Sequence, residues 1–155
     1  MPRLSVVMPV HNALPYLDEA IESILRQTFA DFEFVILDDG STDGSSEALR
    51  GWARRDPRIR LVRSGTRLGP AGSSNRVVAE AQGPIVARMD ADDVAHPERL
   101  KNQLTLLEAE PDAVLIGSLW DVIDESGRKV RVADRSRLLR VSPFAPFAHP
   151  TIMCR

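Results

Sequence analysis

The amino-acid sequence predicts an α/β fold built on a mostly parallel β-sheet. Short apolar runs rich in β-branched residues alternate with longer stretches whose apolar residues recur at helical spacing, which is the pattern of repeated β-α units. The apolar runs are nearly continuous, as expected for strands covered on both faces. With 155 residues, of which 43% are hydrophobic and 27% charged, the chain has the size and composition of a single globular domain over residues 1–155.

Five strands are predicted from the apolar runs, over residues 4–8, 32–37, 59–62, 85–89 and 113–117. Pro9 is expected to end the first strand, because proline has no N–H for a sheet hydrogen bond. Residues 122–130 have the pattern of a hairpin that turns near Ser126 and Gly127. Residues 141–155 contain three prolines and no helical pattern, and they stop at what we expect to be the start of another element.

Four helices are expected between these strands. The first should begin at Pro15, since a proline suits the first helical turn. Ser41 or Thr42 can cap the second helix, the third should end at Gly83, and the fourth should begin at Pro97. The buried faces are expected to carry Leu17, Ile21, Ile24 and Leu25 in the first helix, Ala48, Leu49 and Trp52 in the second, and Leu100, Leu104 and Leu107 in the fourth.

Composition excludes several classes of protein. A net charge of −2 argues against general nucleic-acid binding, and no run of eighteen apolar residues is present to span a membrane. The N-terminus lacks the apolar stretch of a signal peptide. Cys154 is the single cysteine, so an intramolecular disulfide is impossible and a cytoplasmic location is expected. One cysteine and three histidines also argue against a structural zinc site.

Basic residues form two clusters in the sequence. Seven arginines lie between Arg50 and Arg67, and six basic residues lie between Arg128 and Arg140. Solvated faces and loops are the favoured interpretation of both clusters. The alternative is a surface for anionic lipid or a phosphorylated acceptor, which would place the protein peripherally at the inner face of the membrane.

Three polar clusters follow predicted strands: residues 11–12, 38–43 and 90–93. Because the carboxyl ends of parallel strands meet at one edge of a sheet, we expect all three clusters to gather there, where α/β proteins bind ligands. Three carboxylates in four residues, at Asp90, Asp92 and Asp93, repel one another unless a cation offsets them. Hard cations such as Mg²⁺ and Mn²⁺ suit such ligands. An acidic loop, or carboxylates that cap the next helix, is the alternative.

The second cluster has both a ligand-binding and a structural interpretation. A fixed carboxylate at Asp39 can accept a hydrogen bond from a base or from ribose hydroxyls, and we favour ligand contact there. For Ser41, Thr42 and Asp43 we favour a structural role at the start of the helix. His11 can stack on a base or simply end a strand, and Asn12 suits a turn as well as a ligand contact.

The loop over residues 69–75 contains glycine and enters a helix, so its N–H groups can face a phosphate. It matches neither the dinucleotide-binding fingerprint nor the P-loop. No nucleophile elbow of the G-x-S-x-G type is present in the sequence. These absences argue against a Rossmann dehydrogenase, a Walker ATPase and an α/β-hydrolase.

Five segments in this order resemble the family 2 glycosyltransferases, which have the GT-A fold, a Rossmann-like α/β/α sandwich: residues 4–12, 23–29, 38–43, 90–93 and 149–151. The resemblance implies transfer of a sugar from a nucleotide diphosphate, commonly UDP, to a carbohydrate or lipid-linked acceptor, with inversion and with Mg²⁺ or Mn²⁺. It implies metal ligands at Asp92 and Asp93. The nucleotide-sugar-binding set that it implies is Pro9, Val10, His11, Asn12, Asp39, Asn75, Asp90, Ala91 and Asp92.

The sequence also departs from the pattern of this family. His11 stands where tyrosine is frequent, and Ser73 to Arg76 replaces an Ala-Arg-Asn sequence, so a phosphate contact from that arginine is absent or moved to Arg76. The carboxylate general base of the family lies C-terminal to the His-Pro-Thr segment, so we expect it beyond Arg155 and assign no catalytic residue. The chain is therefore expected to be the donor-binding N-terminal part of a longer transferase.

Two other functions compete with this interpretation. A sugar nucleotidyltransferase would carry a Gly-rich basic loop directly after the first strand, and residues 8–12 contain none. A non-catalytic nucleotide-binding or assembly module remains an alternative, because no base is assigned. A sheet that ends at residue 155 would also leave an edge uncovered, so we expect self-association through residues 141–155, as a homodimer.

Overall fold

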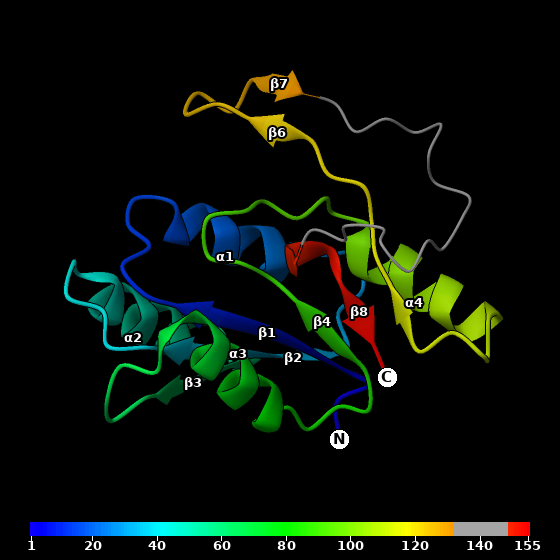
Figure 1. Ribbon diagram of the computed structural model, residues 1–155, viewed down its shortest axis with the longest axis horizontal. Coiled ribbons are helices and arrows are strands. Elements are labelled where there is room, and N and C mark those ends of the chain that lie inside the picture. The colour runs from blue at the N-terminus through cyan, green and yellow to red at the C-terminus, as the bar shows by residue number, and fades with distance from the viewer. Residues whose placement is uncertain (132–148) are drawn as a thin grey trace.

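The computed structural model describes residues 1–131 and 149–155, and within them the central sheet has six strands in the order β3-β2-β1-β4-β8-β5. Strands β1 (Leu4–Val10), β2 (Phe32–Asp38), β3 (Ile59–Arg63) and β4 (Val86–Arg88) are mutually parallel. Strand β8 (Met153–Cys154) runs antiparallel between β4 and β5 (Leu115–Ile116). The prediction of a mostly parallel α/β sheet is confirmed (Figure 1).

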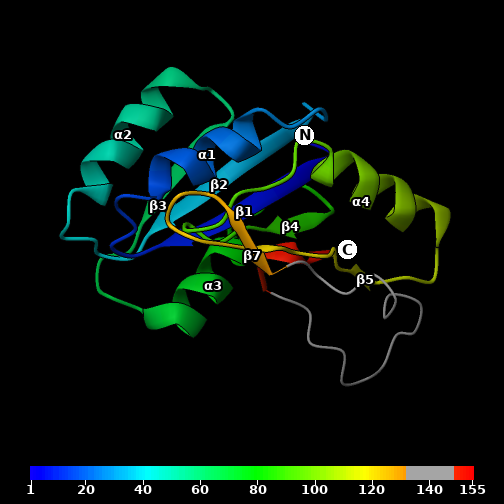
Figure 2. The ribbon, with the colours of Figure 1, turned by 90° about the horizontal axis from the view of Figure 1, so that it is seen from above.

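Helices cover both faces of this sheet, as Figure 2 shows. Helices α1 (Leu17–Leu25), α2 (Ser45–Arg55) and α4 (Arg99–Ala109) lie on one face, and α3 (Gly69–Ala79) lies on the other. Alternation along β1 separates two cores: Leu4, Val6, Met8 and Val10 join the larger core with α1, α2 and α4, whereas Val7 packs with Val77 of α3. The buried residues predicted in α1 and α4 are confirmed, apart from Leu25, which is half-buried.

Proline at position 9 does not end the first strand, contrary to the sequence prediction. Pro9 is paired with Leu37 within β1. The backbone groups of Ser5 and Val7 point toward β4, because the Ser5 N–H donates to the Ile85 carbonyl and the Val7 carbonyl accepts from Met89. Pro9 faces the same side, where the pairing with β4 has already ended at Val7. Its missing N–H therefore costs the sheet no hydrogen bond.

The helix boundaries also differ from the predictions. Helix α1 begins at Leu17, two residues after Pro15, and α3 ends at Ala79, four residues before Gly83. The expected capping of α2 by Ser41 or Thr42 is wrong. Gly44, whose φ of 101° is left-handed, precedes the helix, and the side chain of Asp43 accepts the Ser45 N–H at 2.9 Å.

Helix α4 begins at Arg99, two residues after Pro97, and α1 positions its start. The amide of Gln27 accepts the Leu100 N–H at 2.9 Å and donates to the His96 carbonyl at 2.7 Å. Ser23 accepts the Ala95 N–H at 3.0 Å. The segment 23–29, which carried part of the family resemblance, thus supplies the cap that α4 lacks in its own sequence.

The end of the chain is built into the sheet. Strand β8 follows the short 3₁₀ helix η2 (His149–Thr151) and pairs on both of its sides, so the predicted element is confirmed. Among the described strands, the edges of the sheet are β3 and β5 rather than β8. Residues 132–148, with most of the segment expected to self-associate, lie outside the described residues. Self-association stays a prediction.

The predicted hairpin is confirmed as strands β6 (Val122–Ile123) and β7 (Lys129–Arg131), which form a separate two-stranded sheet (Figure 1). Most of the first basic cluster is neutralised within the fold, in agreement with the favoured interpretation. Its ion-paired members are Arg50 with Glu47, Arg58 with Asp56, Arg60 with Glu33 and Glu80, and Arg63 with Asp38. Every helix within the described ranges is too short or too polar to span a membrane.

Glycine at position 83 is required where the loop before β4 touches β1. A Cβ placed at Gly83 would lie 2.9 Å from the Leu4 carbonyl carbon and 2.9 Å from the Ser5 nitrogen, both in the backbone of a fully buried strand segment. We expect Gly83→Ala to lower the free energy of unfolding by about 1–3 kcal/mol, because sheet backbone cannot move aside easily.

Gly51 provides a matched control, because a Cβ there would meet no atom within 4 Å and the residue lies inside α2. Gly51→Ala should raise the free energy of unfolding by about 0.5–1 kcal/mol. Urea titrations of the wild type and both variants measure these differences. A Gly83→Ala variant as stable as the wild type would contradict the prediction.

Candidate nucleotide-binding site

A cavity of about 480 Å³ lies at the carboxyl ends of β1, β2 and β4. The loops that follow these strands form its walls, as predicted from the three polar clusters. Eight of the predicted binding residues line it: Pro9, Val10, His11, Asn12, Asp39, Asp90, Ala91 and Asp92. Asn75 and Asp93 are not among the described lining residues. The structure thus brings most of the predicted set together, without testing what each residue binds.

The loop after β1 is held by side chains from the loop after β2. The Asn12 N–H donates to Ser41 Oγ at 3.1 Å, and the Asn12 side chain accepts the Thr42 N–H at 2.8 Å. The Leu14 N–H donates to Asp43 Oδ2 at 3.0 Å. Asn12 also adopts a left-handed φ of 53°, which asparagine tolerates better than most residues. The helix-start role favoured for Asp43 is confirmed, because it accepts the Ser45 N–H. Ser41 and Thr42 instead connect two loops through Asn12.

The carboxylate of Asp39 lies at the back of the cavity and is only 2% exposed. It accepts hydrogen bonds from the Ser64 hydroxyl at 3.0 Å and from the N–H groups of Leu68 at 2.7 Å and Gly69 at 2.9 Å. Burial by itself raises the pKa of Asp39, but the hydrogen bonds from Leu68, Ser64 and Gly69 outweigh burial and hold the pKa below its ordinary value. Asp39 therefore stays ionised and organises the loop that leads into α3.

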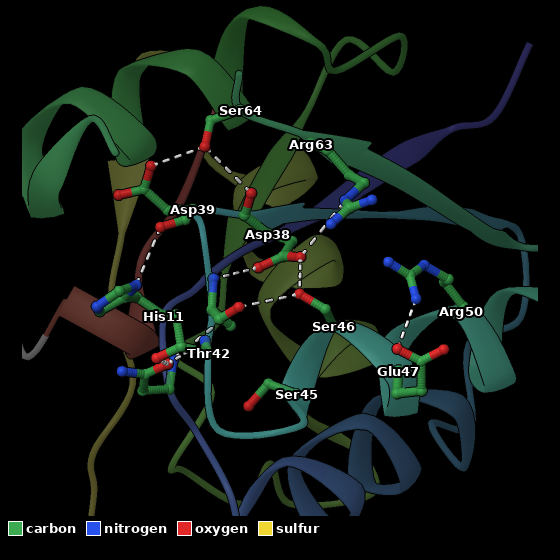
Figure 3. Close-up of polar contacts among 12 residues, drawn as sticks. His11, Asp38, Asp39, Thr42, Ser45, Ser46, Glu47, Arg50, Arg63 and Ser64 are labelled. Atoms are coloured by element: carbon green, nitrogen blue, oxygen red, sulfur yellow. Dashed lines mark hydrogen bonds and ion pairs between the residues drawn. The ribbon is translucent and has the colours of Figure 1, made fainter. Parts of the chain in front are cut away.

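His11 is fixed against the same residue. Its Nδ1 lies 3.0 Å from the Asp39 carbonyl oxygen, so Nδ1 carries a proton and donates to that carbonyl (Figure 3). In the neutral ring Nε2 is then an acceptor. Neighbouring Asp38 is equally buried and accepts from the Ser41 N–H and the Ser46 hydroxyl (Figure 3). Adjacent carboxylates at the end of β2 thus hold two different loops.

The acidic turn after β4 contains the candidate cation ligands. Asp90 is paired with Arg88 at 3.0 Å, and Asp92 is exposed. Burial, followed by the negative charges of Asp92 and Asp90, raises the pKa of Asp93 to about 6, against the opposing charge of Arg99. In residues 1–131 and 149–155, no three histidine, cysteine or carboxylate side chains converge into a metal cluster. One or two carboxylates still fit Mg²⁺ or Mn²⁺, which commonly take their remaining ligands from phosphates and water.

Three polar residues that line the cavity were not predicted from the sequence. Tyr16, Arg67 and Arg88 line it, and Tyr16 and Arg67 are exposed. Arg88 also donates to Ser74 Oγ at 3.0 Å, which connects the acidic turn to α3. Arg76, the other position considered for a phosphate contact, is instead paired with Glu80 at 2.7 Å. Alternation along β4 was the available signal, because Ala87 and Met89 are buried on one face and Arg88 must face the other.

Comparison with known proteins shows the family of this chain. The family model described as glycosyl transferase family 2 matches residues 5–151, and the chain belongs to this family. EpsE of Bacillus subtilis (strain 168), which carries a glycosyltransferase name, is 36% identical over 162 residues, covering 99% of this chain and 56% of that protein. The chain spans about half the length of the curated relatives that it matches.

Solved structures support the predicted GT-A fold. A crystal structure of S. aureus TarS 1-349 in complex with UDP-GlcNAc has a TM-score of 0.80 and 22% identity, covering 99% of this chain and 45% of that one. The mannosyltransferase PcManGT from Pyrobaculum calidifontis, in complex with GDP-Man and Mn2+, has a TM-score of 0.69 and 31% identity, covering 79% of this chain and 36% of that one. The α/β fold predicted from sequence is that of family 2 glycosyltransferases.

Replacement of Asp39 by asparagine tests its role in ordering the loop before α3. An amide has one acceptor oxygen and places an NH₂ group against one of the three donors, so we expect Asp39→Asn to lower the free energy of unfolding by about 1–3 kcal/mol at pH 7. Asp31→Asn is the control, because Asp31 is exposed at the opposite end of β2. Urea titration measures both variants.

The stability difference between the wild type and Asp39→Asn should also depend on pH. Because the pKa of Asp39 is lower in the folded chain than its ordinary value of 3.8, the stability contributed by its carboxylate is present above that pH and lost as the pH falls below it. The stability difference between the wild type and Asp39→Asn should therefore narrow below about pH 4. A difference that stays constant from pH 7 to pH 3 would contradict this explanation.

Proposed function

We propose that this chain binds a nucleoside diphosphate sugar together with Mg²⁺ or Mn²⁺, as the donor-binding part of an inverting glycosyltransferase. The observation that carries the proposal is the convergence of Asp39, His11 and the acidic turn on one cavity at the carboxyl edge of a parallel sheet. Membership in family 2 supports it, as do the bound UDP-GlcNAc of TarS and the bound GDP-Man of PcManGT.

The lining of the cavity suits both the base and the diphosphate of such a donor. Pro9, Val10 and His11 form a mixed apolar and aromatic wall, and we assign the base to this wall with Asp39 behind it. Tyr16 adds a second exposed ring on which a base can stack. Because Nε2 of His11 and the Asp39 carboxylate both accept hydrogen bonds, they suit a base that presents N–H donors, as uracil does. UDP is therefore the first donor to test.

The lining of the cavity also carries charges of both signs. A diphosphate and the acidic turn are both anionic, so they can approach each other only with cations between them. Arg67 and Arg88 line the cavity and supply two fixed positive charges. Asp92 and Asp93 would hold a divalent cation. When bound, this cation would neutralise negative charge on the departing diphosphate. Asp92 is the stronger candidate, because it is exposed and lines the cavity, whereas Asp93 is half-buried.

The proposal covers the donor side of the reaction. Residues 69–75, expected as a loop, form the first turns of α3, and Gly69, Pro70 and Ser73 contribute to the cavity wall. We assign the phosphates to this part of the wall. Asn75 lies on α3, beyond these lining residues, and its contact with the donor remains a prediction. A carbohydrate or lipid-linked acceptor, and a carboxylate base outside residues 1–155, complete the proposed reaction.

Isothermal calorimetry of the chain with UDP, with and without MnCl₂, tests the proposal. We expect Mn²⁺ to increase the affinity for UDP. We expect Asp92→Ala to reduce this Mn²⁺-dependent gain in UDP affinity by about tenfold or more, which corresponds to about 1.4 kcal/mol. Asp31→Ala, an exposed carboxylate at the other end of the sheet, should keep the wild-type gain.

The melting temperature of Asp92→Ala should be no lower than that of the wild type, because the side chain is exposed and its loss relieves repulsion on Asp93. UDP affinity that is the same with and without Mn²⁺, or an Asp92→Ala variant that keeps the full gain, would overturn the assignment of the cation to the acidic turn.

A further inference from the structure

Helix α4 buries two strongly polar side chains beside the acidic turn. Its inward face consists of Arg99, Leu100, Gln103, Leu104 and Leu107. Arg99 is 8% exposed and Gln103 is 5% exposed. Burying a guanidinium group is costly unless hydrogen bonds and opposite charges compensate for the lost water, and an apolar side chain would be a simpler way to fill this space. The contacts of Arg99 and Gln103 therefore need an explanation beyond packing.

Arg99 holds the end of β4 from which the acidic turn begins. Its Nη2 donates to the Arg88 carbonyl at 2.7 Å, and its Nη1 lies 3.6 Å from the sulfur of Met89. These are the two residues directly before Asp90. The third donor, Nε, points to Gln103 Oε1 at 3.0 Å. The planar guanidinium thus fixes the backbone that precedes the carboxylates and connects it to the next turn of α4.

Gln103 extends this connection to the returning end of the chain. Its Nε2 donates to the Thr151 carbonyl at 2.6 Å. Ile152, the residue after Thr151, contacts Arg88 directly, because its carbonyl accepts the Arg88 N–H at 2.9 Å. The two backbone groups of Arg88 are therefore held by Arg99 on one side and by Ile152 on the other. The start of the acidic turn and η2 are joined through two buried side chains.

The charge of Arg99 also acts on the acidic turn. Burial lowers the pKa of Arg99 to about 10, so it remains a cation at neutral pH, and the charges of Asp93 and Asp90 act to raise it. The guanidinium of Arg99 donates to Gln103, Met89 and Arg88. Its charge therefore offsets the repulsion among the carboxylates, while these donors go to partners other than the oxygens of Asp92 and Asp93 within residues 1–131 and 149–155.

We propose that Arg99 and Gln103 are positioning residues that hold the Asp90–Asp93 turn against η2, in the arrangement that binds a divalent cation. This inference rests on the proposed function, because it assumes that the cation is bound at Asp92 and Asp93. It assigns a role in the donor site to two residues outside the cavity lining, and it makes the affinity for the cation depend on the position of residues 149–152.

Two variants that keep the charge of Arg99 test this role. Arg99→Lys retains a cation but loses the fork that reaches Arg88 and Gln103 together, and Gln103→Leu removes the contact with Thr151. We expect both to weaken the Mn²⁺-dependent gain in UDP affinity by about tenfold, the range found when residues behind metal ligands are replaced. UDP affinity without metal should stay within about twofold of the wild type, since neither side chain lines the cavity.

Controls lie on the exposed side of the same helix. Lys101→Arg exchanges ammonium for guanidinium, and Asn102→Leu exchanges an amide for an apolar side chain, at exposed positions. Both should bind UDP with and without Mn²⁺ as the wild type does. Urea titration shows which variants fold, and if Arg99→Lys does not, Gln103→Leu decides the outcome.

Calorimetry separates the outcomes. A folded Arg99→Lys or Gln103→Leu variant that keeps the wild-type Mn²⁺ gain overturns the positioning role. Equal losses with and without Mn²⁺ also overturn it, because they indicate a general structural effect. If Mn²⁺ does not increase the UDP affinity of the wild type, the result contradicts the proposed function itself and, with it, the positioning role. A loss of the gain in these variants alone supports both.

Discussion

Two carboxylates at the end of β2, Asp38 and Asp39, are the constraint on which the site depends. Each is 2% exposed, so each must find hydrogen-bond donors inside the protein. Asp38 takes them from the loop before α2, and Asp39 takes them from the loop before α3. The donors are largely backbone N–H groups, so satisfying the carboxylates also fixes the course of both loops. The walls of the cavity are a consequence of this requirement.

The acidic turn after β4 is anchored in a different way. Its carboxylates repel one another, and within the turn the Asp93 N–H donates to the Asp90 carbonyl at 3.4 Å. Much of the order of the turn therefore comes from the residues around it. Arg88 and Arg99 place positive charges beside the turn, and the buried amide of Gln103 connects Arg99 to the backbone of Thr151. The side chain of Arg155 then binds the carbonyls of Leu107, Pro111 and Ala113 at the end of α4. The last seven residues thus complete the support of a turn sixty positions earlier.

Much of the fold could be predicted from the sequence because it follows from local patterns. The apolar runs located β1, β2 and β3 to within two residues, and helical spacing identified the buried leucines of α4. The boundaries were less predictable, since they depend on neighbours. Pro9 stays inside β1 because the pairing with β4 has ended beside it, and α4 starts where Gln27, which follows α1, accepts the N–H of Leu100, the second residue of α4. Neither partner can be identified from the local sequence.

For the site, the sequence by itself determined which chemical groups follow the strands and that parallel strands bring them to one edge. Together with the resemblance of five segments to family 2 glycosyltransferases, that was enough to predict eight of the cavity-lining residues and the family. Only the tertiary structure decided how those groups are used. It engaged the Asp39 carboxylate with three donors of its own chain, brought Tyr16, Arg67 and Arg88 to the cavity, and placed β8 inside the sheet. The physical reason is that hydrogen bonding of buried groups and pairing of charges depend on distances between segments far apart in the chain, whereas strand and helix patterns depend on neighbours.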